Sequence, residues 1–428
     1  MAIVSSCFVL AISVYVALYG LEFDNGILRR FQIEFEDPKV NRTGQKFSEE
    51  SPMSMRVTIP RSTMDHSSSV LKDDFYRHSC PSAQRLIRKE IRRIYHARPS
   101  IAPSLIRLLF HDCFIEGCDA SVLLDTDESQ TSSKLVEFFL VLLDSDGSIT
   151  SEKEAAPNLS LKGFDVIDTI KSILENVCPG VVSCADIIVL AARESVKVAG
   201  GPRYHLKTGR KDSLLAFKDK AELQLPSPHA NLSEILASFY SRGFTTREMV
   251  CLSGAHSIGI THCTFFEDRL YNFSGTGKPD PELNTGFLQE LKTKCPFSGS
   301  AASPSPSPCP GLAASLPASH SLSSGKKNAT GVIDLSFNNE GGEAEFGVRY
   351  YKRLMQKKGV LFSDHQLMGS EESLRWVRAY ASDPQLFRQD FVSSMAKLSS
   401  HGVLTGALGE VRRSCSKSSL KKEHTEGN

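Results

Sequence analysis

Residues 106–125 combine side chains that could carry chemistry, in the order IRLLFHDCFIEGCDASVLLD. Arg107 and His111 are four residues apart, so an α-helix would place both side chains on one face. Arginine stays positively charged, whereas the histidine imidazole titrates near neutral pH and can move a proton. Oxygen-bearing side chains follow closely, at Asp112, Asp119 and Ser121. A cation, an imidazole and several oxygen ligands in one short stretch predict a chemical role rather than packing alone.

The overall composition is that of a soluble globular protein. The chain has 428 residues, enough for one large domain or two ordinary ones, with 40% hydrophobic and 23% charged residues. Lysine and arginine total 50 against 49 for aspartate and glutamate, so the formal net charge is only +1. A nucleic acid or an acidic polymer is therefore not indicated as a partner, unless a local patch provides for one.

The N-terminal residues 1–20 form an apolar run that ends before Glu22. Its length favours the apolar region of a secretion signal, and a membrane anchor or a buried helix is the alternative. Eleven cysteines without a CxxC zinc spacing favour an oxidising compartment. Five N-x-S/T sequons support the same interpretation, at Asn41, Asn158, Asn231, Asn272 and Asn328.

The chain divides into a polar extension, a helical domain and a polar tail. Residues 21–70 are polar and poorly periodic, so we expect an extension without stable structure outside the fold. Apolar residues then recur at helical spacing, for example within 164–177 and 185–198, and convincing strands are few. The fold is therefore predicted to be mainly α over residues 71–416, with a polar tail at 417–428.

Two segments interrupt the helical pattern. Residues 126–151 contain the apolar run LVEFFLVLL between two polar loops. An extra buried element and translated intron sequence are equally good interpretations of this segment. Residues 298–326 contain SPSPSPCP and a run rich in Ser, Ala and Gly, which predicts an extended, solvated loop.

Several motifs together resemble the secreted plant haem peroxidases of class III. They are FHDCFIEGCDASVLL, GFDVID, VSCADI, LSGAHSIG, FSDHQL and VRRSC, in the order found in that family and spread over residues 73–415. The resemblance implies a mainly α fold with very little β structure. It also implies one haem b held between a distal and a proximal helical half.

The resemblance assigns the distal chemistry to residues within 106–125 and to Asn158. His111 would be the acid and base that moves the proton of H2O2, and Arg107 would stabilise negative charge as the O–O bond breaks. Phe110 would form a wall of the pocket. Asn158 would accept the N–H of the distal imidazole, so we expect it to be buried and unmodified although it begins a sequon.

The proximal half would come from residues far along the chain. His256 in LSGAHSIG matches the axial ligand of haem iron, and Asp364 in FSDHQL matches the carboxylate that binds its other ring nitrogen. Such a carboxylate increases electron donation from the imidazole to iron. Pro226 matches the residue at the exposed haem edge where phenols dock. The resemblance implies two more cofactor contacts, Ser104 and Ser160.

The resemblance also implies calcium. The distal Ca2+ would bind the side chains of Asp112, Asp119 and Ser121, the carbonyls of Ile115 and Gly117, and Glu152 through water. The step from Asp119 to Glu152 is longer than in the family because of residues 126–151.

The proximal Ca2+ site departs more from the family pattern. Ser257 fits one ligand position, but Gly342 and Gly347 stand where the family has Thr and Asp. We therefore expect a degraded site, or one that uses Glu340, Glu343 or Glu345.

Eight cysteines match the four disulfides of the family. Spacing alone could not pair them, because eight cysteines allow about 105 connectivities. The resemblance implies the pairs Cys80–Cys178, Cys113–Cys118, Cys184–Cys415 and Cys263–Cys295. Cys251 lies in an apolar helix and is interpreted as a buried free thiol.

The function implied by the resemblance is H2O2-dependent one-electron oxidation of phenolic donors through a ferryl and porphyrin-radical intermediate. Roles in hydrogen peroxide removal and in phenolic oxidation of the cell wall follow from it. The mature protein would be a secreted monomeric glycoprotein without a membrane span, in the extracellular space or cell wall, or alternatively in the vacuole. The alternative is a catalytically impaired Ca2+- and haem-binding glycoprotein of the same fold.

Overall fold

The computed structural model describes residues 71–126, 150–297, 331–335 and 346–418, and the backbone of two strands at 32–35 and 55–58. The chain separates into two compact units, Met1–Ser69 and Val70–Asn428. In the first unit, β1 (Gln32–Phe35) pairs antiparallel with β2 (Met55–Thr58). This hairpin lies within the segment for which the sequence predicts no stable structure.

Several sequence predictions fall outside the described residues. They are the secretion signal at 1–20, the remainder of the extension at 21–70, the interior of the 126–151 segment, the 298–326 loop and most of the 417–428 tail.

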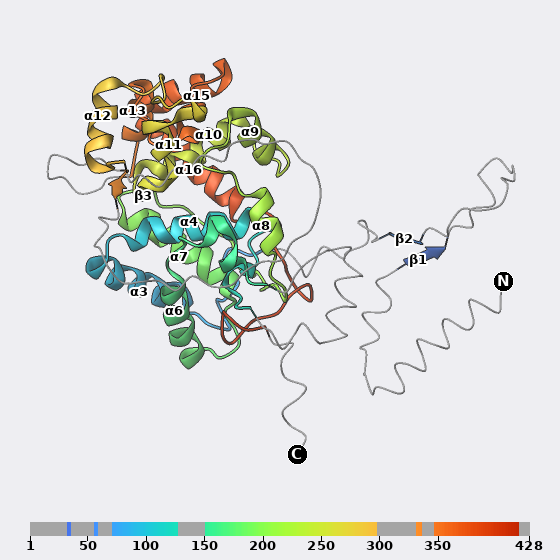
Figure 1. Ribbon diagram of the computed structural model, residues 1–428. Coiled ribbons are helices and arrows are strands. Elements are labelled where there is room, and N and C mark those ends of the chain that lie inside the picture. The colour runs from blue at the N-terminus through green and yellow to red at the C-terminus, as the bar shows by residue number, and fades with distance from the viewer. Residues whose placement is uncertain are drawn as a thin grey trace, which may run out of the picture. The chain divides into compact units, whose positions relative to one another are not determined.

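The second unit is mainly helical, as predicted, and its helices form two groups (Figure 1). The lower group in the view contains α3 (Ala83–Ala97), α4 (Ile101–Cys113), α6 (Phe164–Val177) and α7 (Cys184–Val198). The upper group contains α9 (Leu232–Tyr240), α10 (Thr246–Ser253), α11 (Glu267–Tyr271), α12 (Thr285–Lys294), α13 (Arg349–Met355), α15 (Glu371–Ser382) and α16 (Pro384–Leu398). Two further short helices are α8 (Lys218–Gln224) and α14 (Phe362–Gln366).

Helix α7 is the centre of the lower group. Every residue from Cys184 to Val196 is buried, because α7 packs against α3, α4 and α6. Most of its residues are apolar, and its buried charges are paired, for example Asp186 with Arg210. Ser183 caps its N-terminus by accepting a hydrogen bond from the backbone N–H of Asp186 at 3.2 Å. The partner helix α4 buries Leu105, Leu108 and Leu109, and each buried leucine contributes about 1.5–3 kcal/mol to stability.

The upper group depends on defined helix starts and on a small sheet. Helices α9 and α10 both begin with capping boxes, Asn231–Glu234 in α9 and Thr245–Glu248 in α10. The strands β3 (Ile260–His262) and β4 (Val332–Asp334) pair antiparallel. Among the described residues of the second unit, β3 and β4 form the only sheet.

The cysteine predictions are confirmed. The four disulfides join Cys80 to Cys178, Cys113 to Cys118, Cys184 to Cys415 and Cys263 to Cys295. Cys251 is a buried free thiol.

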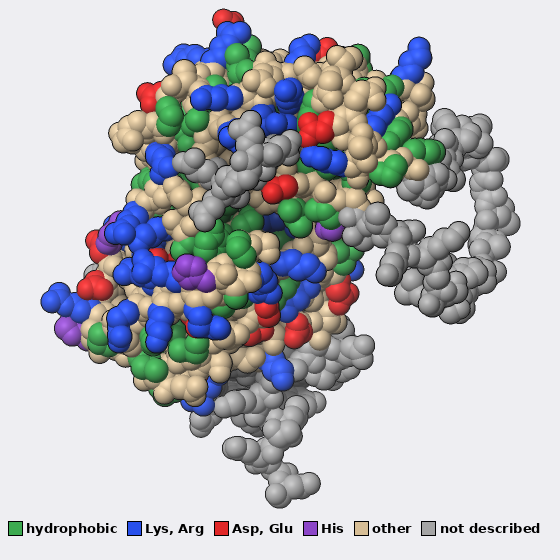
Figure 2. Space-filling model, turned by 90° about the vertical axis from the view of Figure 1, so that its left-hand side faces the viewer, with side chains coloured by type: hydrophobic (Ala, Val, Ile, Leu, Met, Phe, Trp, Pro, Cys, Tyr) green, Lys and Arg blue, Asp and Glu red, His purple; other side chains and the backbone are tan. Residues whose placement is uncertain are grey.

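The surface is locally basic although the net charge is close to zero. Lys and Arg side chains gather on the lower part of the face shown in Figure 2. Helix α3 contributes exposed Arg85, Arg88, Lys89, Arg92 and Arg93. Within the described ranges, no helix has both the length and the apolar character that crossing a bilayer requires.

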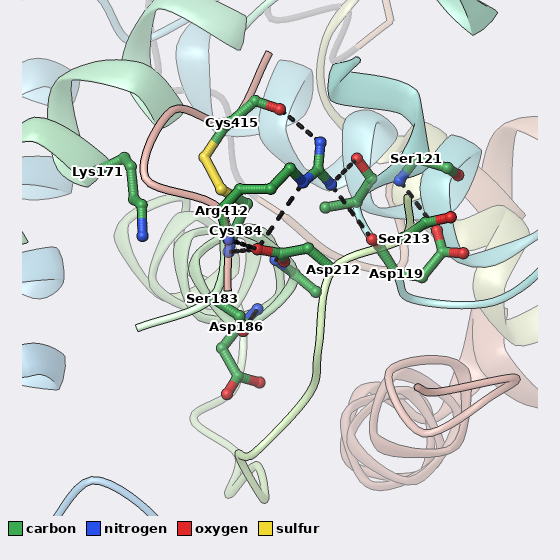
Figure 3. A network of polar contacts seen from close by, with 12 residues as sticks. Asp119, Ser121, Lys171, Ser183, Cys184, Asp186, Asp212, Ser213, Arg412 and Cys415 are labelled. Atoms are coloured by element: carbon green, nitrogen blue, oxygen red, sulfur yellow. Dashed lines mark hydrogen bonds and ion pairs between the residues drawn. A yellow bond between two sulfur atoms is a disulfide. The ribbon is translucent and has the colours of Figure 1, made fainter. Parts of the chain in front are cut away.

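The C-terminal segment is tied to the lower group by a buried polar network (Figure 3). Arg412 is 1% exposed and donates to the carbonyls of Cys415 and Ala120, both at 2.6 Å. Its backbone N–H donates to Asp212 at 3.0 Å, and Asp212 also accepts from the first N–H groups of α7, at Cys184 and Ala185. The network therefore joins the end of the chain to α7 and to the loop after α4.

We expect Arg412→Leu to lower the free energy of unfolding by about 3–5 kcal/mol, because it removes the positive charge beside the buried Asp212 and leaves two carbonyls without their donor. Denaturant unfolding with the disulfides intact measures the change. Arg413→Leu is the matched control, because Arg413 is exposed and its loss should change stability by less than about 0.5 kcal/mol. Equal stability of the two variants would contradict this account of the network.

Candidate active site

The distal residues of α4 meet a short segment that lies far from them in the sequence. His111 is 8% exposed, and its Nδ1 lies 2.6 Å from Oδ1 of Asn158, which is in the turn η3 (Ala156–Asn158). The amide Nδ2 of Asn158 donates to the carbonyl of Glu152 at 2.8 Å, which turns Oδ1 toward the imidazole. Nδ1 of His111 is thus the protonated nitrogen, and Nε2 is left as the basic one.

The environment of His111 keeps its imidazole neutral. Burial is the main reason that the pKa of His111 is lowered to about 3. The positive charge of Arg107 also lowers this pKa, and the hydrogen bond with Asn158 raises it by less. At neutral pH the ring can therefore accept a proton at Nε2.

Arg107 is held by the same short segment that holds His111. Its Nη1 donates to Oγ of Ser160 at 3.0 Å, and its Nη2 donates to the carbonyl of Pro157 at 2.9 Å. Burial lowers the pKa of Arg107 to about 10, so the guanidinium stays charged at neutral pH. Phe110 stacks on Phe114 with ring centroids 4.5 Å apart and makes an edge contact with the imidazole of His111.

The proximal pair is also brought together. His256 lies in the turn η4 (Gly254–Ser257), and its Nδ1 is 2.8 Å from Oδ1 of Asp364 at the start of α14. The side chain of His256 is 44% exposed, whereas that of Asp364 is 4% exposed. Among the described residues, none forms a hydrogen bond with Nε2 of His256. A histidine anchored at Nδ1 with Nε2 free has the arrangement of a metal ligand.

The pKa of His256 reflects three opposing influences. Burial lowers the pKa of His256 while Asp364 raises it by more, and the charge of Arg107 contributes a further lowering. A haem cofactor would be held through His256, and it would supply the redox chemistry that the side chains lack.

A cluster of buried carboxylates adjoins His111. Asp112, Asp119 and Glu152 are at most 3% exposed. In the described part of the chain, Oδ1 of Asp112 and Oε2 of Glu152 have no hydrogen-bond partner. Burial raises the pKa of all three groups, to about 6 for Asp119, to about 8 for Glu152 and well above the usual range for Asp112. Repulsion by Asp119 adds to the rise for Asp112 and Glu152. Orphaned buried oxygens of like charge are what a hard cation would satisfy.

The cluster could not hold a cation through carboxylates alone. No group of three or more His, Cys, Asp or Glu side chains in the described ranges is placed to bind a metal. A Ca2+ ion here would also need the hydroxyl of Ser121 and backbone carbonyls, and the sequence nominates Ile115 and Gly117 for the latter. The Cys113–Cys118 disulfide closes that loop.

Gly117 is the residue that allows the loop to pack. Its φ of +124° is in the region that favours glycine, and a Cβ built there would lie 2.2 Å from the carbonyl oxygen of Gly402. The close approach of Gly117 and Gly402 joins the loop to the segment that follows α16.

The contacts of the remaining predicted residues do not show a role in the site. Oγ of Ser257 accepts a hydrogen bond from the backbone N–H of Gly347 at 3.3 Å, and the glutamates nominated beside it lie outside the described residues. Oγ of Ser104 donates to the carbonyl of Ser100 at 2.9 Å. Pro226 is partly buried just after α8. The described contacts connect none of these three to the histidines.

The sequence does not predict one contact of the proximal pair. The phenol of Tyr350 donates to Oδ1 of Asp364 at 2.8 Å, the same oxygen that His256 approaches. In the sequence, Tyr350–Tyr351 is only a pair of aromatic residues on a helix, and its spacing gives no sign of this contact.

Comparison with known proteins agrees with the fold and the site. The family model described as "Peroxidase" matches residues 87–383. The chain is 60% identical over 417 residues to "Putative Peroxidase 48" of Arabidopsis thaliana, covering 96% of each chain. It is 40% identical over 350 residues to "Peroxidase N" of Armoracia rusticana, covering 81% of this chain and 90% of that one. The chain belongs to the peroxidase family, and its plant relatives fit the class III resemblance. It is therefore a peroxidase, an oxidoreductase that reduces hydrogen peroxide.

The match with the first Arabidopsis relative extends beyond the helical domain. Since it covers 96% of this chain, it reaches into the N-terminal extension. The extension is thus shared with at least one other protein.

We expect Asn158 to carry no glycan when the protein is made in a secretory host, because the side chain is 2% exposed and bonded to His111 and Glu152. Peptide mass spectrometry before and after glycan release measures occupancy of each sequon. The exposed Asn231 is the comparison site in the same sample. A glycan at Asn158 would contradict the position described for this residue.

Proposed function

We propose that the protein is a haem-b peroxidase that oxidises phenolic donors one electron at a time. The observation that carries the proposal is the pair of histidines, each bonded at Nδ1 by a side-chain oxygen and each with no partner for Nε2 among the described residues. Haem b bound through His256 would supply the redox chemistry that side chains cannot provide.

The distal residues would activate the peroxide. Nε2 of His111 would take a proton from one oxygen of H2O2 and return it to the leaving oxygen, which departs as water. The guanidinium of Arg107 stabilises the negative charge that develops on that oxygen. Ser160 and the carbonyl of Pro157 hold the guanidinium in place.

The proximal residues would set the electron donation to iron. Asp364 accepts the Nδ1–H of His256 and gives the imidazole anionic character. Tyr350 shares the same oxygen of Asp364, so it moderates that effect. Each phenolic donor gives one electron and one proton, and two donors complete the reduction of one H2O2 to two water molecules. Pro226 is proposed to line the edge where these donors dock, and Ser104 to contact the cofactor.

Ca2+ is proposed as a structural ion of the distal half. The ligands would be the side chains of Asp112, Asp119 and Ser121, the carbonyls of Ile115 and Gly117, and Glu152 through water. Asp112 directly follows His111, so a cation there would fix the end of α4 that carries the acid–base residue. Ser257 remains a candidate ligand of a second, proximal ion.

The location proposed is outside the cell, in the wall or alternatively the vacuole. Four disulfides and five sequons support an oxidising, glycosylating route. Removal of hydrogen peroxide and oxidation of wall phenolics would then be its roles, carried out by a monomer.

We expect His111→Leu to slow the reaction of the haem-loaded protein with H2O2 by about 10²–10⁴-fold, because no other group can move the proton. Stopped-flow measurement of the Soret change on mixing with H2O2 gives this rate, and guaiacol oxidation gives turnover. His229→Gln is the matched control, because that histidine is exposed on the loop before α9. A wild-type protein that binds haem but oxidises no guaiacol would overturn the proposed function in favour of an impaired haem-binding glycoprotein.

We expect Asp119→Asn to reduce the Ca2+ retained after gel filtration and to lower the thermal midpoint, because a ligand is lost from the carboxylate cluster. Elemental analysis and thermal unfolding measure the two effects. Glu116→Gln is the control from the same loop, because Glu116 is exposed and pairs with Lys220. Equal Ca2+ content in the two variants would refute the assignment.

A further inference from the structure

A row of aromatic side chains runs from the proximal histidine toward the surface. Ring centroids are 6.2 Å apart for His256 and Tyr350, 5.0 Å for Tyr350 and Tyr351, 5.2 Å for Tyr351 and Tyr380, and 6.0 Å for Tyr380 and Trp376. Phenol and indole are the side chains that lose an electron most easily, and electron transfer weakens steeply with distance. Rings in contact along the whole row are therefore a favourable route.

The hydrogen bonds along the row suit electron transfer. The phenol of Tyr380 donates to Oδ2 of Asp390 at 2.6 Å, so its proton has an acceptor when the ring loses an electron. Tyr351 donates only to the carbonyls of Val250 and Cys251, which are poor proton acceptors. Its ring therefore passes the electron between its two neighbours and does not hold a stable radical itself.

The far end of the row is the single tryptophan of the chain. Trp376 on α15 is partly exposed, whereas Tyr350, Tyr351 and Tyr380 are at most 7% exposed. An electron entering the row from outside must therefore enter at Trp376, because the other rings are covered.

Positive charge surrounds this indole. The guanidinium of Arg247 lies 4.4 Å from the ring centroid and that of Arg375 lies 5.0 Å from it. Both arginines are exposed, and Arg247 is fixed by a two-point contact with Asp390. Guanidinium groups attract anionic donors and disfavour a cation radical on the indole. Oxidised Trp376 would therefore release its N–H proton to solvent and become a strongly oxidising neutral radical.

We propose that Trp376 is a second donor site, at which polymeric phenols bearing negative charge deliver electrons through Tyr380, Tyr351 and Tyr350 to the proximal side of the peroxidase centre. This inference rests on the haem-peroxidase function proposed above. It adds a class of donor that is too large to approach the edge near Pro226.

The electrons and protons of the proposed step balance. H2O2 is the oxidant, and it withdraws one electron from Trp376 through the row as the indole proton leaves. A phenolic O–H of the donor then breaks: its electron and a proton restore the indole N–H, and a phenoxyl radical remains on the polymer. Tyr380 passes its proton to Asp390 and recovers it within the same transfer. Two such events consume two electrons and two protons and convert one H2O2 into two water molecules.

The test locates the radical directly. One equivalent of H2O2 is added to the haem-loaded full-length protein with a nitroso spin trap and no donor, followed by peptide mass spectrometry and electron paramagnetic resonance. We expect a trap adduct on the peptide that contains Trp376. Tyr380→Phe should reduce this adduct about tenfold, and Tyr240→Phe, an exposed ring outside the row, should leave it unchanged. An adduct confined to the buried Cys251, or none on Trp376, overturns the inference.

Donor kinetics provide a second readout. Trp376→Phe should lower kcat/KM for lignosulfonate, an anionic phenolic polymer, by a factor about ten times larger than for guaiacol. Equal factors for the two donors overturn the inference while leaving the proposed function intact. If the wild type fails to oxidise guaiacol, the proposed function itself fails.

Discussion

The burial of Asp112, Asp119 and Glu152 beside one another is the constraint on which the distal half depends. Three carboxylates that lose water together repel one another, and two of their oxygens find no donor in the described chain. The protein must either protonate the cluster or supply a cation. The cluster joins the end of α4 to the loop after it and to Glu152, whose carbonyl accepts from Asn158. The orientation of His111 thus depends on Glu152, because Glu152 holds Asn158 and Asn158 holds the imidazole.

In the proximal half, one carboxylate oxygen accepts hydrogen bonds from two donors. Oδ1 of Asp364 receives both Nδ1 of His256 and the phenol of Tyr350. A carboxylate oxygen with two donors is more firmly placed and less basic than one with a single donor. The same contact places a redox-active ring beside the imidazole of His256. One hydrogen bond thus connects the anchoring of the histidine to the aromatic row that leads to Trp376.

Much of the site could be predicted from the sequence because the motifs are local. Arg107 and His111 are four residues apart on one helix, as their spacing predicts. The helical fold and the disulfides followed from the family resemblance. Tyr350, Tyr380 and Arg412 could not be predicted, because their roles depend on partners that only packing brings near. Glu152 is the intermediate case: the long segment before it makes its sequence position doubtful, yet it is buried beside Asp119.

Arg412 also bears on the order in which the protein can form during synthesis. Its contacts to Ala120 and Asp119, and the Cys184–Cys415 disulfide across 231 residues, belong to the last part of the domain to leave the ribosome. The loop after α4 is therefore incomplete while the proximal half is being made. The chain would complete its distal half only after its own C-terminal segment has been released. The nascent protein would be unable to react productively with peroxide until translation ends.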